Sequence, residues 1–338
     1  MVPAAAFLAA LFAALILTPL ARALAWRSGY LDQPAARKLH RSATALLGGV
    51  AVFAAAALGG LVARGGLPAG VTIQALHLLG GAVLALAVGL WDDRFGMQPL
   101  PKLVGQAAAA AILLAAVPPL GLGLPAALEY VLAGVAMVAL MNAVNFLDNM
   151  NGMVAGMSAI ILAAFAFHSF GRGDPGLGAA QLALAGACTG FLFYNFPRAS
   201  IFLGDAGSLL LGYSLGASAV LAWTGAPTGW GRLGAALMLA YPAFDMIFVV
   251  VNRLRDGRKV YEGGKDHSNH RLASVLRCPK RTVILLWCST AALCASGLAM
   301  LLLNQPRPAL LLSVPWMVLS ILSGLRLSSI PVPRPPRP

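Results

Sequence analysis

Single aspartates stand at the ends of long apolar stretches in this sequence. Asp92 and Asp93 close the run "AVGLWDDRF", Asp148 lies in "NFLDNMNG", and Asp205 lies in "FLGDAGS". Separate carboxylates that converge from several segments can bind Mg²⁺ together with the phosphate oxygens of a substrate. Lys102, at the start of the next apolar stretch, can neutralise further phosphate charge. The pattern therefore indicates phosphate chemistry on a metal ion.

Each of these residues also has a structural interpretation. Asp92 and Asp93 precede Arg94 and could mark or cap a helix end, and Asp205 could cap the helix that follows it. Asn142 and Asn145 share one helix face and could join neighbouring helices through hydrogen bonds. Taken singly, these interpretations compete with a functional one.

A basic loop, "NRLRDGRKVYEGGKDHSNHRL" (252–272), carries His267 and His270. Zinc sites require several closely spaced Cys or His ligands, and only His267-x-x-His270 comes near that pattern. The four cysteines form no C-x-x-C pair, so neither a disulfide framework nor a cysteine zinc site is indicated.

The elements that must position these residues are transmembrane helices. The chain has 338 residues, 59% hydrophobic and only 10% charged, whereas soluble domains carry about 25% charged residues. Apolar stretches of this length exclude a membrane β-barrel and predict an all-α polytopic protein with about eleven spans. The predicted spans are 3–25, 46–64, 73–91, 104–119, 126–146, 153–170, 179–196, 207–224, 233–252, 282–303 and 308–325. The first is expected to be a retained span and not a signal peptide.

The basic residues assign the two sides of the membrane. Only four of the 24 Lys and Arg fall in loops on one side, namely Arg64, Arg172, Arg232 and Arg307, which leaves 20 for the other. The positive-inside rule then places the N-terminus outside and the C-terminus inside. The net charge of +13 thus marks topology and not a nucleic-acid partner.

Nine of the eleven acidic residues also fall on the inside, at the ends of spans; Asp245, within span 233–252, is the least certain of them. This arrangement indicates a site at the cytoplasmic membrane surface and not a conduction path, which would place ionisable groups at mid-depth. Together these residues favour function over the separate structural interpretations. Residues 1–327 are expected to form one domain, and the Pro- and Arg-rich tail 328–338 to be disordered near anionic lipid.

The chain resembles the polyprenyl-phosphate N-acetylhexosamine-1-phosphate transferase family. The resemblance covers most of the chain, through "DQPAARKLH" with "GGV", "DDRFGMQPLPKLVGQ", "NAVNFLDNMNG", "FLGDAGSLLLG" and "KDHSNHRL". It implies eleven spans in a bacterial inner membrane and dependence on Mg²⁺ or Mn²⁺. The implied reaction transfers a sugar 1-phosphate from a UDP-N-acetylhexosamine to polyprenyl phosphate and releases UMP. Membrane lipids are the surroundings, and homodimers occur in the family.

The resemblance also implies roles for individual residues. Asp205 matches the metal ligand, and Asp92, Asp93 and Asp148 match acids placed in catalysis. One of the first pair is proposed to orient or deprotonate the lipid phosphate. The remaining matches are expected substrate contacts: Lys102, Asn142, Asn145, Asn195, His267, His270, Arg271, Arg37, Lys38 and His40.

The chain departs from the family pattern at named positions. Asn151 stands where a second aspartate is usual, which puts catalysis by that position in doubt. Ala45 stands where proline is common. The loop "DHSNHRL" lacks the three-histidine run of the muramoyl-pentapeptide branch, which favours a simpler UDP-N-acetylhexosamine donor. Direct attack by the lipid phosphate is preferred over a phospho-aspartyl intermediate.

Three alternatives remain. One is the phospho-N-acetylmuramoyl-pentapeptide transferase of peptidoglycan synthesis. Another is a non-catalytic binder or transporter of lipid-linked sugars, which should show internal repeats or helices interrupted at mid-membrane. The third is an intramembrane metalloprotease built on His267 and His270, which lacks an obvious third ligand and a well-placed glutamate.

Overall fold

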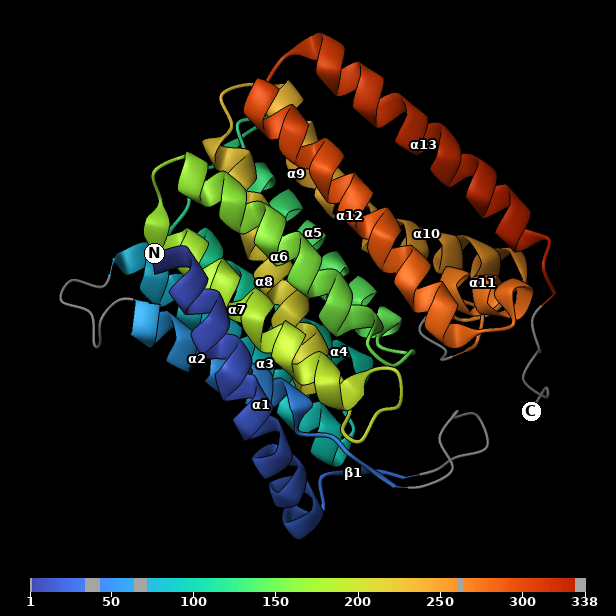
Figure 1. The fold of residues 1–338 in the computed structure, drawn as a ribbon. Coiled ribbons are helices and arrows are strands. Elements are labelled where there is room, and N and C mark those ends of the chain that lie inside the picture. The colour runs from blue at the N-terminus through green and yellow to red at the C-terminus, as the bar shows by residue number, and fades with distance from the viewer. Residues whose placement is uncertain (1, 34–42, 64–71, 261–263, 332–338) are drawn as a thin grey trace.

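The protein is a bundle of helices, seen here in a computed structural model that describes residues 2–33, 43–63, 72–260 and 264–331. Figure 1 shows the helices packed side by side, with α13 along one edge of the bundle. Its helices are α1 (Val2–Ser28), α2 (Gly48–Ala63), α3 (Ile73–Phe95), α4 (Pro99–Leu114), α5 (Ala126–Leu147), α6 (Met153–Gly171), α7 (Pro175–Asn195), α8 (Gly204–Gly225), α9 (Gly229–Met238), α10 (Ala240–Arg255), α11 (Ser268–Leu276), α12 (Pro279–Leu303) and α13 (Pro306–Ser328).

Within the described residues, eight helices are long and apolar enough to cross a membrane. The bent pair α9 and α10 passes the same test as one unit, and α2 and α4 are shorter apolar helices of 16 residues each. The prediction of an all-α protein that crosses the membrane several times is confirmed. Each predicted span overlaps one of these helices or the bent pair.

Two predicted spans differ from the structure. The stretch 233–252 is not one straight helix, because α9 and α10 meet at a bend of 68°. Pro242 lies in the first turn of α10, where it lacks an N–H and its ring disfavours a continuous helix from the preceding turn. Helix α4 runs over 99–114 and not 104–119. Pro99 starts it, so Lys102 lies in its first turn. Helix α11 lies in the basic loop, where no helix was predicted.

Helix α8 is the centre of the bundle. In its most apolar stretch of 18 residues, 83% of the residues are buried, against 6% in the corresponding stretch of α13. Glycines let neighbouring helices approach its first turn closely. A Cβ at Gly89 of α3 would collide with the backbone of Ala206, and one at Gly49 of α2 would collide with Gly207. These contacts fix the start of α8, which carries Asp205, between α2 and α3.

A small sheet lies beside the same turn. Strands β1 (Leu31–Asp32) and β2 (Thr44–Ala45) pair antiparallel, with Leu31 opposite Ala45. Ala45 also forms a parallel bridge with Ile201, and its carbonyl accepts a hydrogen bond of 2.8 Å from Phe202 N. The chain on both sides of residues 34–42 is therefore anchored close to the start of α8.

Candidate active site

Lys102 joins the carboxylates at one end of the bundle. Its Nζ lies 2.7 Å from Asp92 Oδ2 and 2.7 Å from Asp205 Oδ2. It also donates a longer hydrogen bond of 3.3 Å to Asn145 Oδ1. Helices α3, α4, α5 and α8 each contribute one of these four residues. The structure thus brings together acids that stand far apart in the sequence, as the sequence predicted.

Asp93 caps α8 from the end of α3. Its Oδ1 accepts a hydrogen bond of 2.9 Å from Asp205 N, and its Oδ2 one of 3.0 Å from Ala206 N. Gly204, the first residue of α8, has a φ of +75°, and a Cβ there would lie 2.6 Å from Asp93 Oδ2, so only glycine fits. The capping interpretation therefore applies to Asp93, which acts on α8 across the bundle. Asp205 lies within the first turn and turns its carboxylate toward Lys102.

The two asparagines of α5 have different surroundings. Asn145 Nδ2 donates to Asp205 Oδ1 at 2.7 Å and to Ser208 Oγ at 2.8 Å, which orients the Asp205 carboxylate. Asn142 lies about one turn deeper and donates to Gln106 Oε1 at 2.7 Å, joining α4 to α5. Asn145 belongs to the site, while the contacts of Asn142 match the helix-joining interpretation.

Asp148 follows α5 directly and faces the same cluster. Burial, together with the negative charge of Asp205, raises the pKa of Asp148 from 3.8 to about 7. A carboxyl group with such a pKa can hold or release a proton near neutral pH. Asp148 therefore has a pKa suited to proton transfer near neutral pH, and its role in catalysis stays a prediction.

The rest of the 148–152 loop is held by amides. Asn195 Oδ1 accepts a hydrogen bond of 2.7 Å from Gly152 N, while its Nδ2 donates to Ile201 O at 2.9 Å. Both polar groups of Asn195 thus bind backbone, so the residue shapes the loop where the sequence predicted a substrate contact. Asn151 Nδ2 donates to Pro197 O at 3.1 Å.

The basic loop reaches this end of the bundle through a buried aspartate. Asp245 is fully buried in α10, and its Oδ2 accepts a hydrogen bond of 2.7 Å from His267 Nδ1. Its Oδ1 accepts from Ser268 N at 2.8 Å and from the Ser268 hydroxyl. His267 Nδ1 is thereby occupied, so of the two ring nitrogens Nε2 is the one that remains for another partner. The His267 ring lies 6.1 Å from that of Phe146, the residue after Asn145.

A second link joins α11 to the loop after α5. Asn269 Nδ2 donates to Asn149 Oδ1 at 2.7 Å, while Asn149 Nδ2 donates to Phe146 O at 2.7 Å. Asn149 follows Asp148 in the chain, so this bond ties the histidine loop to the position of the acid.

A buried ion-pair group fixes the rest of the basic loop. Arg253 binds both oxygens of Asp266, each at 2.8 Å, and Arg258 Nη1 donates to Asp266 Oδ2 at 2.9 Å. Burial raises the pKa of Asp266, but the hydrogen bonds and charges of the two arginines outweigh it and lower that pKa to about 2. Asp266 stays ionised and holds the residue before His267 in place.

His270 and Arg271 were predicted to contact the donor substrate, and the structure shows what surrounds each of them in the protein. Burial and the neighbouring His267 lower the pKa of His270 from 6.5 to about 4, so its imidazole is neutral near pH 7. Arg271 Nη1 donates to the carbonyls of Leu327, Ser328 and Ile330 at 3.1, 3.1 and 2.7 Å. That guanidinium binds the end of α13, which argues against its use on a donor phosphate. Arg37, Lys38 and His40 lie outside the described residues.

The donor set fits a hard divalent cation better than zinc. No group of three His, Cys, Asp or Glu with metal-site geometry occurs in the described parts of the chain. Mg²⁺, however, needs only one or two protein carboxylates, since phosphate oxygens and water complete its shell. Lys102 Nζ bridges Asp92 and Asp205 at 2.7 Å each, so a positive charge already bridges these two carboxylates. The residues present therefore fit Mg²⁺ or Mn²⁺.

Sequence reasoning gave no role to several residues that position this site. The sequence patterns assigned no function to Gln106, Ser208 or Asp266, and Asp245 counted only as the least certain of the inside acids. Asp245 carried a usable signal, because a lone acid in an apolar span requires a partner and a histidine-containing loop follows it. Gln106 and Ser208 carried none, because uncharged polar residues are common in helices.

Comparisons with known proteins find sugar-phosphate transferases among the relatives of this chain. Residues 75–223 match the family model described as glycosyl transferase family 4. The decaprenyl-phosphate N-acetylglucosaminephosphotransferase of Mycolicibacterium smegmatis is 33% identical over 308 residues, covering 79% of this chain and 74% of the relative. The undecaprenyl-phosphate alpha-N-acetylglucosaminyl 1-phosphate transferase of Salmonella typhimurium is 27% identical, covering 82% and 78%.

Proposed function

Because the chain belongs to the polyprenyl-phosphate N-acetylhexosamine-1-phosphate transferase family, we propose that it transfers N-acetylhexosamine 1-phosphate from a UDP-sugar to a polyprenyl phosphate. An oxygen of the lipid phosphate attacks the β-phosphorus of the donor. The bond from that phosphorus to the bridging oxygen breaks, and UMP leaves with the bridging oxygen. The observation that carries this proposal is the convergence of Asp92, Lys102 and Asp205 at one end of the bundle.

N-acetylglucosamine is the sugar to test first. The mycobacterial and Salmonella relatives are named for transfer of N-acetylglucosamine phosphate, to decaprenyl and undecaprenyl phosphate respectively. The muramoyl-pentapeptide alternative has no such support among these names. The bend between α9 and α10 is one feature that a transporter would also show, because transporters often contain interrupted helices. That bend, however, leads into the buried Asp245–His267 pair beside the predicted catalytic acids, which favours a catalytic site.

The roles follow from the contacts of each residue. Asp93 holds the first turn of α8, so it is a positioning residue for Asp205. Lys102 supplies positive charge between two acids, where negative charge of a diphosphate must be neutralised. The resemblance gave the lipid phosphate to Asp92 or Asp93; because Asp92 binds Lys102 and Asp93 binds the backbone of α8, we propose that Asp148, with its raised pKa, orients or takes a proton from it instead. His267 offers its Nε2 to the donor.

Asp205, with Asp92 nearby, would hold a divalent cation, which would supply further neutralisation of the donor diphosphate. Direct attack remains preferred, because it needs only one organised site. The family, the basic loops and the helices favour eleven spans in the inner membrane, with this end of the bundle in the cytoplasm. Helices α2 and α4, with 16 residues each, would then be short spans of about 24 Å.

The test is UMP release by the purified full chain with undecaprenyl phosphate, Mg²⁺ and a panel of UDP-sugars. We expect lipid-dependent UMP from one UDP-N-acetylhexosamine, lost in Asp205→Ala. Ser274→Ala, which removes only a hydroxyl bonded to the Arg271 carbonyl, is a matched control and should keep the activity. UMP from no donor, with the protein folded, would make the binding or transport alternative the leading one.

A further inference from the structure

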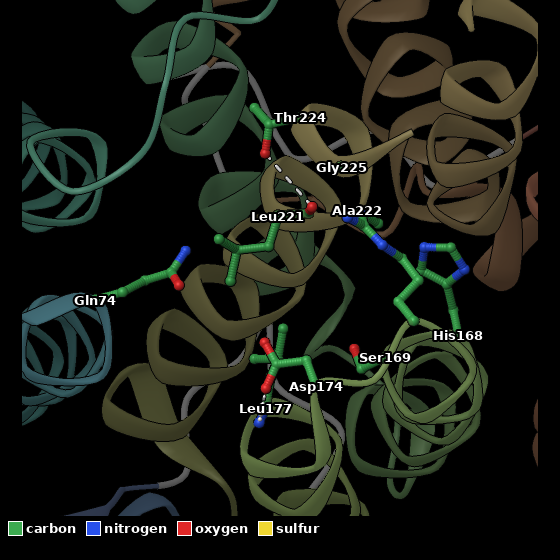
Figure 2. A pocket seen from close by; sticks show the side chains of 10 residues that line it. Gln74, His168, Ser169, Asp174, Leu177, Leu221, Ala222, Thr224 and Gly225 are labelled. Carbon is green, nitrogen blue, oxygen red and sulfur yellow. Dashed lines mark hydrogen bonds between the residues drawn. The ribbon is translucent and has the colours of Figure 1, made fainter. Parts of the chain in front are cut away.

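A cavity of about 210 Å³ lies at the end of the bundle opposite to the candidate active site. It is lined by the end of α6, the start of α7, the end of α8 and the start of α3, and Figure 2 shows Gln74, His168 and Thr224 around it. Helix α6 starts next to the 148–152 loop and has 19 residues, so at 1.5 Å per residue it carries His168 to the other side of a membrane.

His168 in this cavity lacks hydrogen-bond partners. Its side chain lies at a position only 6% exposed, and neither Nδ1 nor Nε2 finds a partner. Buried polar atoms without a partner are rare in folded proteins, because their desolvation is not compensated. An imidazole that lines a cavity in this state indicates that a polar group enters the cavity to bind it.

Arg172 defines the charge of that group. It follows His168 by four residues, which places both side chains on one face at the end of α6. No hydrogen bond or ion pair involves its guanidinium among the residues described, and the guanidinium packs directly on Gly225, where any Cβ would collide with it. Asp174, the acid of this cavity, instead caps α7 through Leu177 N at 2.9 Å. Within the described part of the chain, the Arg172 guanidinium and the His168 imidazole both lack a partner, while the Asp174 carboxylate is bound by Leu177 N, and this pair of donors favours an anion between them.

A more apolar hollow continues from the same cavity. It shares Gln74, Asp174, Leu177 and Leu221 with the first cavity and extends along α3 to Ala75 and Leu78. The charged part and the apolar part together match an amphipathic anion, with its phosphate at Arg172 and a chain along the apolar hollow. A free phosphate would use only the first part.

We propose that this end of the bundle binds the phosphate group of an anionic phospholipid from the membrane leaflet on that side. Arg172 holds the phosphate through charge-assisted hydrogen bonds, and His168 donates a second hydrogen bond to it. The site is separate from the transferase reaction and does not depend on it.

The test compares the unfolding temperature of the full chain in neutral detergent with added phosphatidylglycerol, phosphatidylcholine or inorganic phosphate. We expect phosphatidylglycerol to stabilise at a lower concentration than phosphatidylcholine. Arg172→Met should raise its half-saturating concentration about tenfold or more, since a hydrogen bond to a charged group contributes about that factor. Arg307→Met, at an exposed arginine on the same side of the membrane, is the control and should respond like the unchanged protein.

A second variant keeps the test independent of folding defects. His168→Phe removes the two unpaired nitrogens, so it should raise the unfolding temperature without lipid and weaken the preference for phosphatidylglycerol. Equal stabilisation by both lipids, or a phosphatidylglycerol response unchanged in Arg172→Met and His168→Phe, overturns the proposal. Stabilisation by inorganic phosphate with none by phosphatidylglycerol overturns the assignment to a lipid.

Discussion

Asp245→Asn tests whether the buried aspartate sets the state of His267. The carboxylate accepts from His267 Nδ1 at 2.7 Å through one oxygen and from Ser268 through the other. Asparagine keeps an oxygen for Ser268 but presents an N–H to His267 Nδ1. The imidazole must then accept at Nδ1 and carry its proton on Nε2, the reverse of the native arrangement.

The magnitude follows from the bond that is lost. A hydrogen bond to a charged group is worth about 1.5–3 kcal/mol, so we expect kcat/KM for UMP release to fall by about 10- to 150-fold. KM for the UDP-sugar should rise if His267 binds the donor in the ground state, whereas kcat alone should fall if it acts only in the transition state. If Asp245 has a purely structural role, the variant should yield less folded protein, and the folded fraction should keep the KM and kcat of the unchanged enzyme.

The assay is steady-state UMP release with Asp245→Asn, His267→Ala and the double variant, each checked for its unfolding temperature. Because Asp245 acts through His267, the two losses should not add, and the double variant should resemble His267→Ala. Full additivity, or wild-type kinetics in a folded Asp245→Asn protein, would refute the reasoning.

Three further predictions follow from single contacts. Lys102→Met leaves two carboxylates facing each other without their bridging charge, so UMP release should fall by about 100-fold or more, while Lys102→Arg should retain more activity; equal rates in both would contradict a charge role. Gly204→Ala introduces a Cβ at φ +75° and 2.6 Å from Asp93 Oδ2, and should lower the free energy of unfolding by about 1–3 kcal/mol, measured by denaturation in detergent. Asp266 has a pKa of about 2 in the folded chain against an ordinary 3.8, so its stabilisation is complete above about pH 4 and is lost as pH falls toward 2. The unfolding-temperature gap between wild type and Asp266→Asn should close over that range, and a gap independent of pH would show that the ion pair is not its source.

Much of the fold was predictable because hydropathy reports directly on membrane helices. Runs of about 20 apolar residues locate the spans, and the polar residues between them locate the site. The bend between α9 and α10 was not predicted, since Pro242 is compatible with either a helix start or a kink. Helix α11 was missed because it has only nine residues of mixed polarity and depends on Asp245 and Asn149 for its position.

The sequence also predicted which acids converge, but not how they divide the work. Asp92 and Asp93 are neighbours in the chain, so their side chains leave the helix about 100° apart. One therefore meets Lys102 and the other meets the backbone of α8. This division depends on where α8 begins relative to α3. The close packing at Gly89 and Gly204 sets that position, and no local sequence pattern reveals it.

Asn151 is the departure from the family pattern that the structure helps to interpret. Its Nδ2 donates to Pro197 O, and a carboxylate in this place could not donate at neutral pH. The neighbouring Gly152 N binds Asn195 Oδ1, so two hydrogen bonds fasten this loop to the 195–197 turn. An amide at position 151 thus supports a rigid loop, and the ionisable group of the loop is Asp148 alone.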